Sequence, residues 1–160
     1  PQDGCQISPS IYAKHMDVNY MGVVNGLAAI VPQMLAAGGG QIVIISSVAG
    51  WRGLPKAAAY GPTKAALISL AESLYFDLTP KDIKIQIMCP GFVDTEATAV
   101  NDFDMPDLLT AEKAADHIIS GMQTNVFSND FPKSFTRKLK FLRYLPDRLY
   151  FALVSKQTGV

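Results

Sequence analysis

Hydrophobic residues recur along the first quarter of the chain at the spacing of an α-helix. From about residue 9 to residue 37, apolar side chains recur at helical spacing: Ile11, Met16, Val18, Met21, Val24, Leu27, Ile30 and Leu35. This spacing predicts one long helix. Ser8 and Pro9 suit its start, because serine is a common N-cap and proline fits the first turn. Pro32 predicts a kink or a break, and the glycines at 38–40 predict the end of the helix.

Two short runs of β-branched residues follow, with a second helical pattern between them. Residues 41–46 form a short β-branched run, as expected of a strand that is buried on both faces, and residues 83–88 predict the next strand. Residues 60–79 have helical spacing, and the Gly and Pro content of residues 47–59 predicts a loop. Because helices alternate with buried strands, the pattern predicts the α/β class with a parallel sheet.

The second half of the chain has a weaker pattern. Residues 92–109 have mixed polarity and no clear period. Thr110 predicts the N-cap of a helix to about residue 123, with Glu112 near the positive end of the helix dipole. Residues 125–128 predict a last short strand.

The composition narrows the class of protein. The chain has 160 residues, 49% of them hydrophobic, which suits at most one domain with a buried core. A formal net charge of zero argues against bulk nucleic-acid binding. The sequence contains no uninterrupted run of about 20 apolar residues, so it does not predict a membrane span. Cys5 and Cys89 have no metal-ligand spacing, so no metal site is expected, and Cys89 is interpreted as an inert core thiol.

Tyr60 and Lys64 lie four residues apart at the start of the second predicted helix, so they share one helix face. Ser47 stands thirteen residues before Tyr60, at the end of the first predicted strand. A free tyrosine has a pKa of about 10, and a neighbouring lysine cation is expected to lower it. The pair then forms a general acid and base. Spacing alone leaves open a half-buried tyrosine beside a solvated lysine.

Three stretches of the chain together resemble the short-chain dehydrogenase/reductase family. They are residues 17–26, 45–67 and 85–96. The matching elements are Asn19, Ser47, Tyr60 with Lys64, and Pro90 with Gly91. The resemblance covers nearly all of residues 5–130. It implies the C-terminal portion of a Rossmann-like, doubly wound parallel sheet, and hydride transfer between NAD or NADP and a carbonyl or alcohol.

The resemblance also implies catalytic roles. Tyr60 is expected to donate a proton to the developing alkoxide, and Lys64 to stabilise the tyrosinate. Ser47 is expected to donate a hydrogen bond to the same substrate oxygen. Asn19 is expected to hold a water that connects the lysine to solvent. A buried polar residue that bonds the backbone is the alternative for Asn19, and a strand-end cap is the alternative for Ser47.

Further residues are expected to hold the cofactor and the substrate. The expected cofactor-binding set is Tyr60, Lys64, Pro90, Gly91, Val93 and Thr95. Gly91 is expected to let the backbone approach a flat ring, the Val93 backbone to bind the carboxamide, and Thr95 to contact carboxamide or phosphate. The expected substrate set is Ser47, Phe92, Phe103 and Met105, which favours an apolar substrate. Core packing explains Phe103 and Met105 equally well.

One feature of the family has no counterpart in this chain. Its members open with a glycine-rich turn after a strand, whereas the glycines at 38–40 follow a helix. We therefore expect the C-terminal part of a longer reductase, lacking roughly the first hundred residues and inactive by itself. Residues 1–130 are interpreted as the catalytic part and residues 131–160 as a basic amphipathic extension. The strand at 41–46 is expected to be an unpaired edge, which predicts aggregation or oligomerisation.

The last residues carry a concentration of positive charge. Residues 133–156 hold seven of the fourteen Lys and Arg residues and one acidic residue, Asp147. Four apolar residues in this segment form a helical stripe: Phe135, Leu139, Leu142 and Leu145. Peripheral membrane contact, a cover over the active site and docking on a partner subunit are all open, beside a plain solvated face.

The resemblance implies a homodimer or homotetramer through the two long helices. A cytoplasmic location is expected, with membrane association as an extension of it. A catalytically incompetent fragment, or a module that binds a membrane or partner through the basic segment, is the alternative function.

Overall fold

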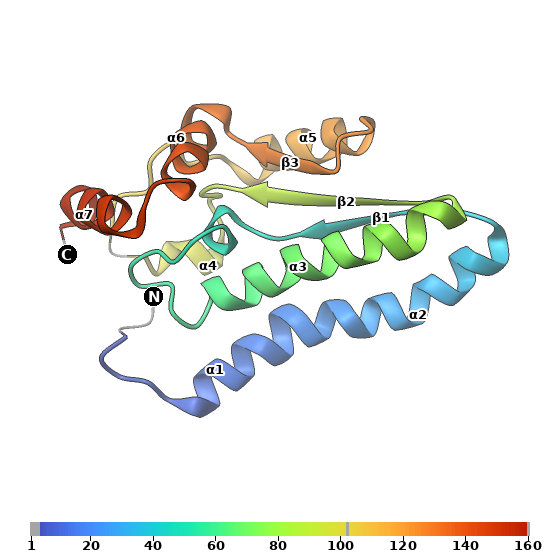
Figure 1. Cartoon of the computed structure of the whole chain (residues 1–160), viewed down its shortest axis with the longest axis horizontal. Helices are drawn as coiled ribbons and strands as arrows, with labels where there is room; N and C mark the ends of the chain where they lie inside the picture. The colour runs from blue at the N-terminus through green and yellow to red at the C-terminus, as the bar shows by residue number, and fades with distance from the viewer. Residues whose placement is uncertain (1–3, 102, 160) are drawn as a thin grey trace.

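Three parallel strands form the sheet of the computed structural model, in the order β1–β2–β3 (Figure 1). They are β1 (Gly40–Ile45), β2 (Ile83–Pro90) and β3 (Ser128–Phe131). β1 pairs with β2 from Gly40 opposite Ile83 to Ile45 opposite Met88, and β3 pairs with the last four residues of β2. The structure describes residues 4–101 and 103–159. The predicted α/β class and the parallel, Rossmann-like sheet are confirmed.

The third strand lies three residues beyond its predicted position of 125–128. The strand ends at Phe131, which is buried. Asp130, the residue before it, is also buried. The side chain of Asp130 is hydrogen-bonded by Thr136 and Lys140 from a helix that follows. An apolar pattern does not identify such a strand, because its burial depends on partners that lie later in the chain.

The first helix runs from Pro9 to Ala37 in three parts. They are α1 (Pro9–Met16), a π-helical turn η1 (Asp17–Met21) and α2 (Gly22–Ala37). Pro32 does not break α2, because the carbonyl that it leaves without a partner belongs to Ala28, on the exposed side. Gly38 ends the helix as predicted, with a left-handed φ of 79°. Ser8 is the N-cap by position, but its side chain makes no capping hydrogen bond.

This first helix also has the length and apolar composition of a membrane span, which the sequence did not predict. Among the described residues, Pro9–Ala37 is the single helix long and apolar enough to cross a membrane, on length and composition alone. Only 6% of its most apolar window is buried in the structure. Polar residues such as Asn25 interrupt the apolar run, and for that reason it was not predicted as a span. A helix of a soluble protein passes the same test.

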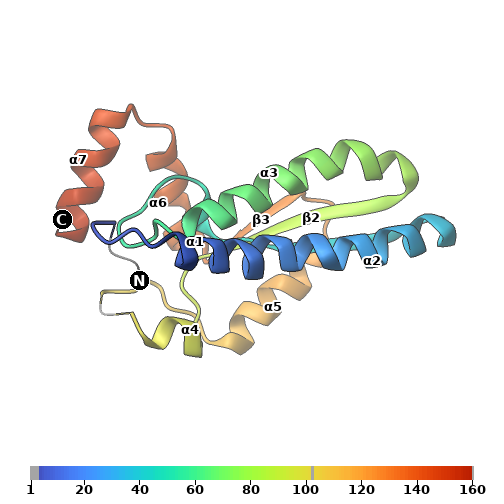
Figure 2. The same ribbon diagram turned by 90° about the horizontal axis from the view of Figure 1, so that it is seen from below.

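Helices cover both faces of the sheet (Figures 1 and 2). On one face, α2 and α3 (Gly61–Leu78) enclose a core that contains Ile85, Ile87 and Leu67. On the other face, α5 (Ala111–Met122) packs against Met88 and Phe131 through Ala114. Alternate residues of β2 therefore face two separate cores, as expected of a strand buried on both sides. Thr110 caps α5 as predicted, accepting a hydrogen bond from the Lys113 N–H.

The remaining helices gather at the end of the sheet to which the strands point (Figure 1). They are the short α4 (Glu96–Ala99), α6 (Lys133–Arg143) and α7 (Asp147–Thr158). The basic segment therefore forms two helices. The predicted stripe of Phe135, Leu139, Leu142 and Leu145 is half-buried, so this side of α6 faces the protein. The short 3₁₀ turns η2 (Val48–Gly50) and η3 (Thr79–Lys81) complete the described elements.

Candidate active site

Ser47 follows the carboxyl end of β1, at the edge where parallel sheets bind ligands. Its Oγ accepts a hydrogen bond of 3.2 Å from the Ala49 N–H and thereby starts η2. The preceding residue, Ser46, donates from Oγ to the Lys64 carbonyl at 2.8 Å. This bond ties the end of β1 to the first turn of α3, so the strand and the helix hold the site residues in a fixed relation.

Gly50 allows the loop after Ser47 to lie directly against α3. A Cβ at Gly50 would stand 2.7 Å from the carbonyl carbon of Lys64 and 2.8 Å from the Ala65 nitrogen. Both atoms belong to the helix backbone and cannot move aside as a flexible side chain would. Only glycine fits here, and its close approach brings Ser47 next to the start of α3.

Tyr60 stands immediately before α3, with the Ser47 side chain near its phenol. Burial raises the pKa of Tyr60, and the Ser47 hydroxyl lowers it by less. The residue as a whole is 37% exposed. The expected lowering of this pKa by Lys64 is wrong for this structure. With a pKa above its ordinary value of 10.0, the phenol keeps its proton at neutral pH.

Lys64 lies beneath the tyrosine, on the same side of α3. Its Nζ donates to the Ile45 carbonyl at 3.1 Å and stands 5.6 Å from the centre of the Tyr60 ring. Burial lowers the pKa of Lys64, and the neighbouring Cys89 partly raises it again. Burial also raises the pKa of Cys89 to about 11. That thiol is 1% exposed and stays protonated, in agreement with the predicted inert role.

Asn19 reaches the site through a residue that sequence reasoning did not single out. It lies in the π-helical turn η1, and its Nδ2 donates to Thr63 Oγ1 at 3.1 Å. Thr63 in turn donates to the Tyr60 carbonyl at 2.7 Å and is 1% exposed. Short π-helical segments are frequent at functional sites. The sequence signal for Thr63 was its position three residues after Tyr60, from which a threonine hydroxyl can bond back to the backbone of its own helix.

The loop after β2 lies beside these residues at the same edge of the sheet. Pro90 is the last residue of β2, and the Gly91 N–H donates to the Phe131 carbonyl at 2.8 Å. A Cβ on Gly91 would stand 2.8 Å from Cδ1 of Phe135 in α6. A flat ring does approach Gly91 closely, but it is the ring of Phe135. The glycine is therefore required by the packing of α6.

Val93 and Thr95 continue this loop towards α4. Val93 bridges to Leu109, and its carbonyl accepts a hydrogen bond of 2.7 Å from Thr98 Oγ1. No residue in the described part of the chain accepts a hydrogen bond from the Val93 N–H. The Thr95 N–H donates to Thr98 Oγ1 at 3.0 Å, and the two hydroxyls lie 3.3 Å apart. The Val93 N–H is thus available to a ligand, while the Thr95 hydroxyl already has a neighbour.

The residues expected to contact substrate form an aromatic cluster next to this loop. The Phe92 ring lies 6.0 Å from Phe103 and 5.5 Å from Phe135, measured between ring centres. Met105 accepts a hydrogen bond of 3.4 Å from the Asn101 side chain. The cluster is apolar and partly open, since Phe103 is 37% exposed. A contact between these residues and a substrate stays a prediction.

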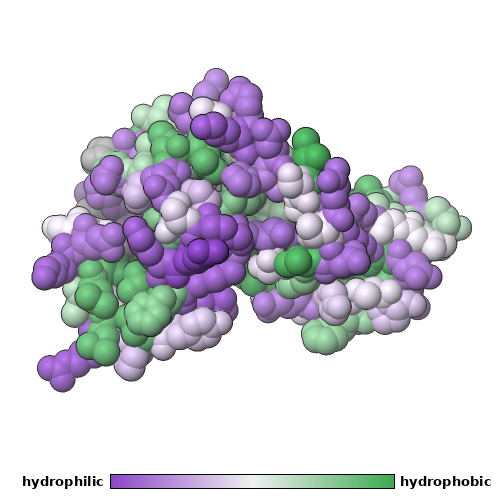
Figure 3. Space-filling view, turned by 90° about the horizontal axis from the view of Figure 1, so that it is seen from above, coloured by the Kyte–Doolittle hydropathy of each residue, from purple (hydrophilic) through white to green (hydrophobic). Residues whose placement is uncertain are grey.

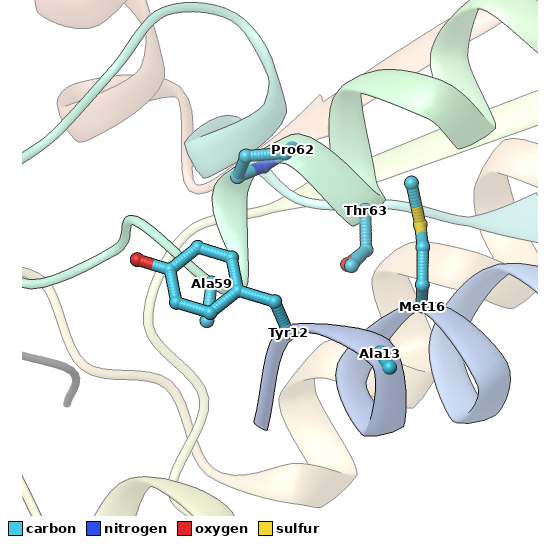
Figure 4. Close-up of a pocket in the computed structure, with 6 residues that line it drawn as sticks. All are labelled: Tyr12, Ala13, Met16, Ala59, Pro62 and Thr63. Carbon is cyan, nitrogen blue, oxygen red and sulfur yellow. The ribbon is translucent and has the colours of Figure 1, made fainter. Parts of the chain in front are cut away.

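A separate hollow of about 280 Å³ lies between α1 and the start of α3 (Figure 4). Tyr12, Ala13 and Met16 of α1 face Ala59, Pro62 and Thr63 across it. None of the predicted catalytic side chains lines the hollow, so the candidate active site is not identified with it. Among the described residues, no group of three or more His, Cys, Asp or Glu side chains is placed to hold a metal.

Comparison with known proteins gives the class to which this fold and site belong. A family profile described as short chain dehydrogenase matches residues 4–105. An uncharacterized oxidoreductase of Myxococcus xanthus (strain DK1622) is 35% identical over 141 residues, which is 88% of this chain and 56% of the relative. The chain therefore belongs to the short-chain dehydrogenase family. It spans about half the length of the relatives it matches.

Solved structures agree with this assignment. A short chain dehydrogenase from Burkholderia cenocepacia J2315 in complex with NADP superposes with a TM-score of 0.78 at 23% identity, covering 92% of this chain and 60% of that one. At this identity the likeness shows the fold alone. A 3-oxoacyl-(acyl-carrier protein) reductase with bound NAD from Brucella melitensis has a TM-score of 0.69 at 29% identity, covering 81% of this chain and 53% of that one.

Proposed function

We propose that this chain supplies the catalytic residues of a nicotinamide-dependent oxidoreductase that acts on a carbonyl or alcohol. The observation that carries the proposal is the position of the Tyr60 phenol near the Ser47 side chain, with Lys64 one helical turn away and its Nζ 5.6 Å from the Tyr60 ring. Membership of the short-chain dehydrogenase family supports it. The match covers 56% of the Myxococcus xanthus relative, so the activity of the whole protein is part of this proposal.

Tyr60, Ser47 and Lys64 each have a separate role in the proposed reaction at the substrate oxygen. When bound, a nicotinamide cofactor supplies or accepts the hydride. Tyr60, whose phenol is protonated at neutral pH, donates a proton to the oxygen as negative charge develops there. The Ser47 hydroxyl donates a hydrogen bond to the same oxygen and orients it. The Lys64 ammonium lies close enough to stabilise the tyrosinate that remains.

The polar groups at this edge of the sheet suit a nicotinamide nucleotide. The Lys64 ammonium and the Tyr60 hydroxyl match ribose hydroxyls, and the Val93 N–H matches a carboxamide oxygen. Thr95 is a further candidate for the carboxamide or a phosphate. The related solved structures contain NADP in one case and NAD in another, so both nucleotides stand as candidates for this protein.

Asn19 fits a supporting part in the same proposal. Its amide is joined through Thr63 to the Tyr60 backbone, so it holds the start of α3 as well as its own helix. A water held between Asn19 and Lys64 would return protons to the lysine from solvent. The apolar cluster of Phe92, Phe103 and Phe135 favours a substrate with an apolar body beside its carbonyl.

The test is the substitution Tyr60→Phe in the protein at its full natural length. We expect turnover to fall by roughly 10²- to 10⁴-fold, the usual contribution of general acid catalysis, because the ring remains and only the proton donor is lost. Tyr75→Phe, on the exposed side of the same helix, is the matched control and should leave turnover unchanged. Equal turnover for Tyr60→Phe and the unaltered protein, measured by NADPH or NADH oxidation, would sink the proposal.

A further inference from the structure

The outer face of α6 combines basic and aromatic side chains. Five exposed residues follow one another at intervals of one or three positions: Ser134, Arg137, Lys138, Phe141 and Tyr144. They therefore lie on the side of the helix opposite the half-buried stripe that begins at Phe135. Phe141 is 68% exposed and Tyr144 is 81% exposed. We call this set the outer face of α6.

The neighbouring helix extends the apolar part of this region. Leu149, Phe151 and Leu153 of α7 are 53%, 60% and 47% exposed. Figure 3 shows apolar residues gathered at the left end of the molecule over α7, with strongly polar residues beside them. Large contiguous apolar surface bordered by charge is a mark of an interaction site.

Charge is distributed unevenly between this region and the rest of the chain. Residues 133–158 hold seven basic residues and one acidic residue, whereas the other part of the chain holds seven basic and thirteen acidic residues. Asp147 is paired with Arg52, and Lys133 and Lys140 are paired with the buried Asp130. Among the described residues, Arg137, Lys138 and Arg148 have no acidic partner. The outer face is therefore a net positive surface.

We propose that the outer face of α6, with the exposed apolar side chains of α7, binds an anionic lipid surface. Aromatic side chains enter the boundary between headgroups and acyl chains, while arginine and lysine bind the lipid phosphates. A nucleic acid offers no apolar phase for Phe141 and Leu149. A twofold contact through this face would bring the positive surface of one copy against the same positive surface of the other, which is unfavourable.

The experiment measures flotation of the protein with vesicles of phosphatidylcholine, with and without phosphatidylglycerol. We expect binding only to the anionic vesicles, and a decline as NaCl is raised, because salt screens exposed charges. The double substitution Arg137→Gln/Lys138→Gln should weaken partitioning roughly 30-fold, about fivefold for each charge near an anionic surface. Phe141→Ser/Tyr144→Ser should weaken it roughly tenfold and leave the thermal melting curve unchanged, since both side chains are exposed.

The matched control is Lys81→Gln/Lys113→Gln, which removes the same charge from exposed positions outside the region. It should bind vesicles as the unaltered protein does. No binding to anionic vesicles, or equal losses from the control pair, would overturn the proposal. Binding to a DNA duplex that the α6 substitutions reduce, without vesicle binding, would identify a nucleic acid as the partner. A shift from dimer to monomer in the α6 variants alone, again without vesicle binding, would identify a second copy.

Discussion

The close contact between Gly50 and the backbone of α3 holds the loop that carries Ser47 against the helix. The space for a side chain at Gly50 is taken by backbone atoms of Lys64 and Ala65. Ser46 adds a hydrogen bond to the Lys64 carbonyl on the same side. Together the two contacts fix the distance between the hydroxyl after β1 and the phenol before α3.

Gly50→Ala is expected to move the Ser47 loop away from α3. Overpacking a close contact costs roughly 1 to 3 kcal/mol of stability, and turnover should fall because Ser47 loses its place beside Tyr60. Urea unfolding and steady-state turnover measure the two effects. Gly53→Ala is the control, since nothing lies within 4 Å of a Cβ at that position. If Gly50→Ala and Gly53→Ala behaved alike, the close contact would not be what positions the loop.

At the scale of elements, α6 is anchored to β3 through the buried charge of Asp130. Asp130 in β3 bonds Thr136 and Lys140 of α6, and Lys133 adds an ion pair of 3.2 Å. Lys140 also lies 5.5 Å from the Trp51 ring in the loop after Ser47. Phe135 covers Gly91 from the same helix. The geometry of the loop after β2 therefore depends on how α6 is held.

The stability that Asp130 gives to this contact should decrease at acid pH. Burial raises the pKa of Asp130, but hydrogen bonds from Lys140, Thr136 and Lys133 lower it more, so the net pKa lies below its ordinary value of 3.8. A carboxyl whose pKa is lowered by folding stabilises the folded protein in full at any pH above the pKa that it has in the unfolded chain. This stabilisation is lost as pH falls through the pKa of the folded state.

Asp130→Asn should therefore be less stable than the unaltered protein at neutral pH, by roughly 3 kcal/mol as for one broken buried ion pair. The difference should shrink as pH is lowered below about 4. Urea unfolding at a series of pH values measures it, with the exposed Asp77→Asn as control. A difference that stays constant with pH would show that Asp130 acts through packing alone.

At the scale of the molecule, apolar surface remains exposed on the helices that cover one face of the sheet. Exposed apolar residues of α1, η1 and α2 include Ile11, Met16, Val18, Met21, Ile30 and Leu35, and α3 adds Tyr75 and Phe76. β1 lies at one edge of the sheet. We propose that this face is the contact between copies of the protein.

Val18→Arg/Phe76→Arg should shift the protein towards monomer, because charged side chains at 64% and 76% exposed positions oppose apolar association. Light scattering after size exclusion, over a range of concentrations, measures the assembly. Val126→Arg, a 53% exposed residue before β3, is the matched control and should not alter it. A monodisperse monomer in the unaltered protein would contradict both the proposed contact and the expected aggregation of the chain.

The features that the sequence predicted correctly are those that depend on residues adjacent in the chain. The helix stop at Gly38, the cap at Thr110 and the two apolar strands follow from neighbours in the chain, and the structure confirms them. The position of β3 and the raised pKa of Tyr60 depend on contacts made by folding: Lys140 bonds Asp130 in β3, and the surrounding protein buries Tyr60. A spacing pattern holds no information on such burial or on its energy.

Arg52 joins the loop after β1 to the end of α6. Its guanidinium donates to the carbonyls of Leu142, Arg143 and Leu145, pairs with Asp147, and lies 3.8 Å from the Tyr150 ring. The Tyr150 hydroxyl donates to the Gly53 carbonyl at 2.7 Å. These contacts connect residues that are about 90 positions apart in the chain.

Closing so long a loop is entropically costly, so these contacts should form after the rate-limiting barrier to folding. Arg52→Ala should then accelerate unfolding while leaving the refolding rate nearly unchanged. Stopped-flow kinetics in urea separate the two rates, with the exposed Arg148→Ala as control. Slower refolding with an unchanged unfolding rate would place the Arg52 contacts in the folding nucleus. On the expected outcome, Arg52 acts as a kinetic latch that sets how long the completed site survives between unfolding events.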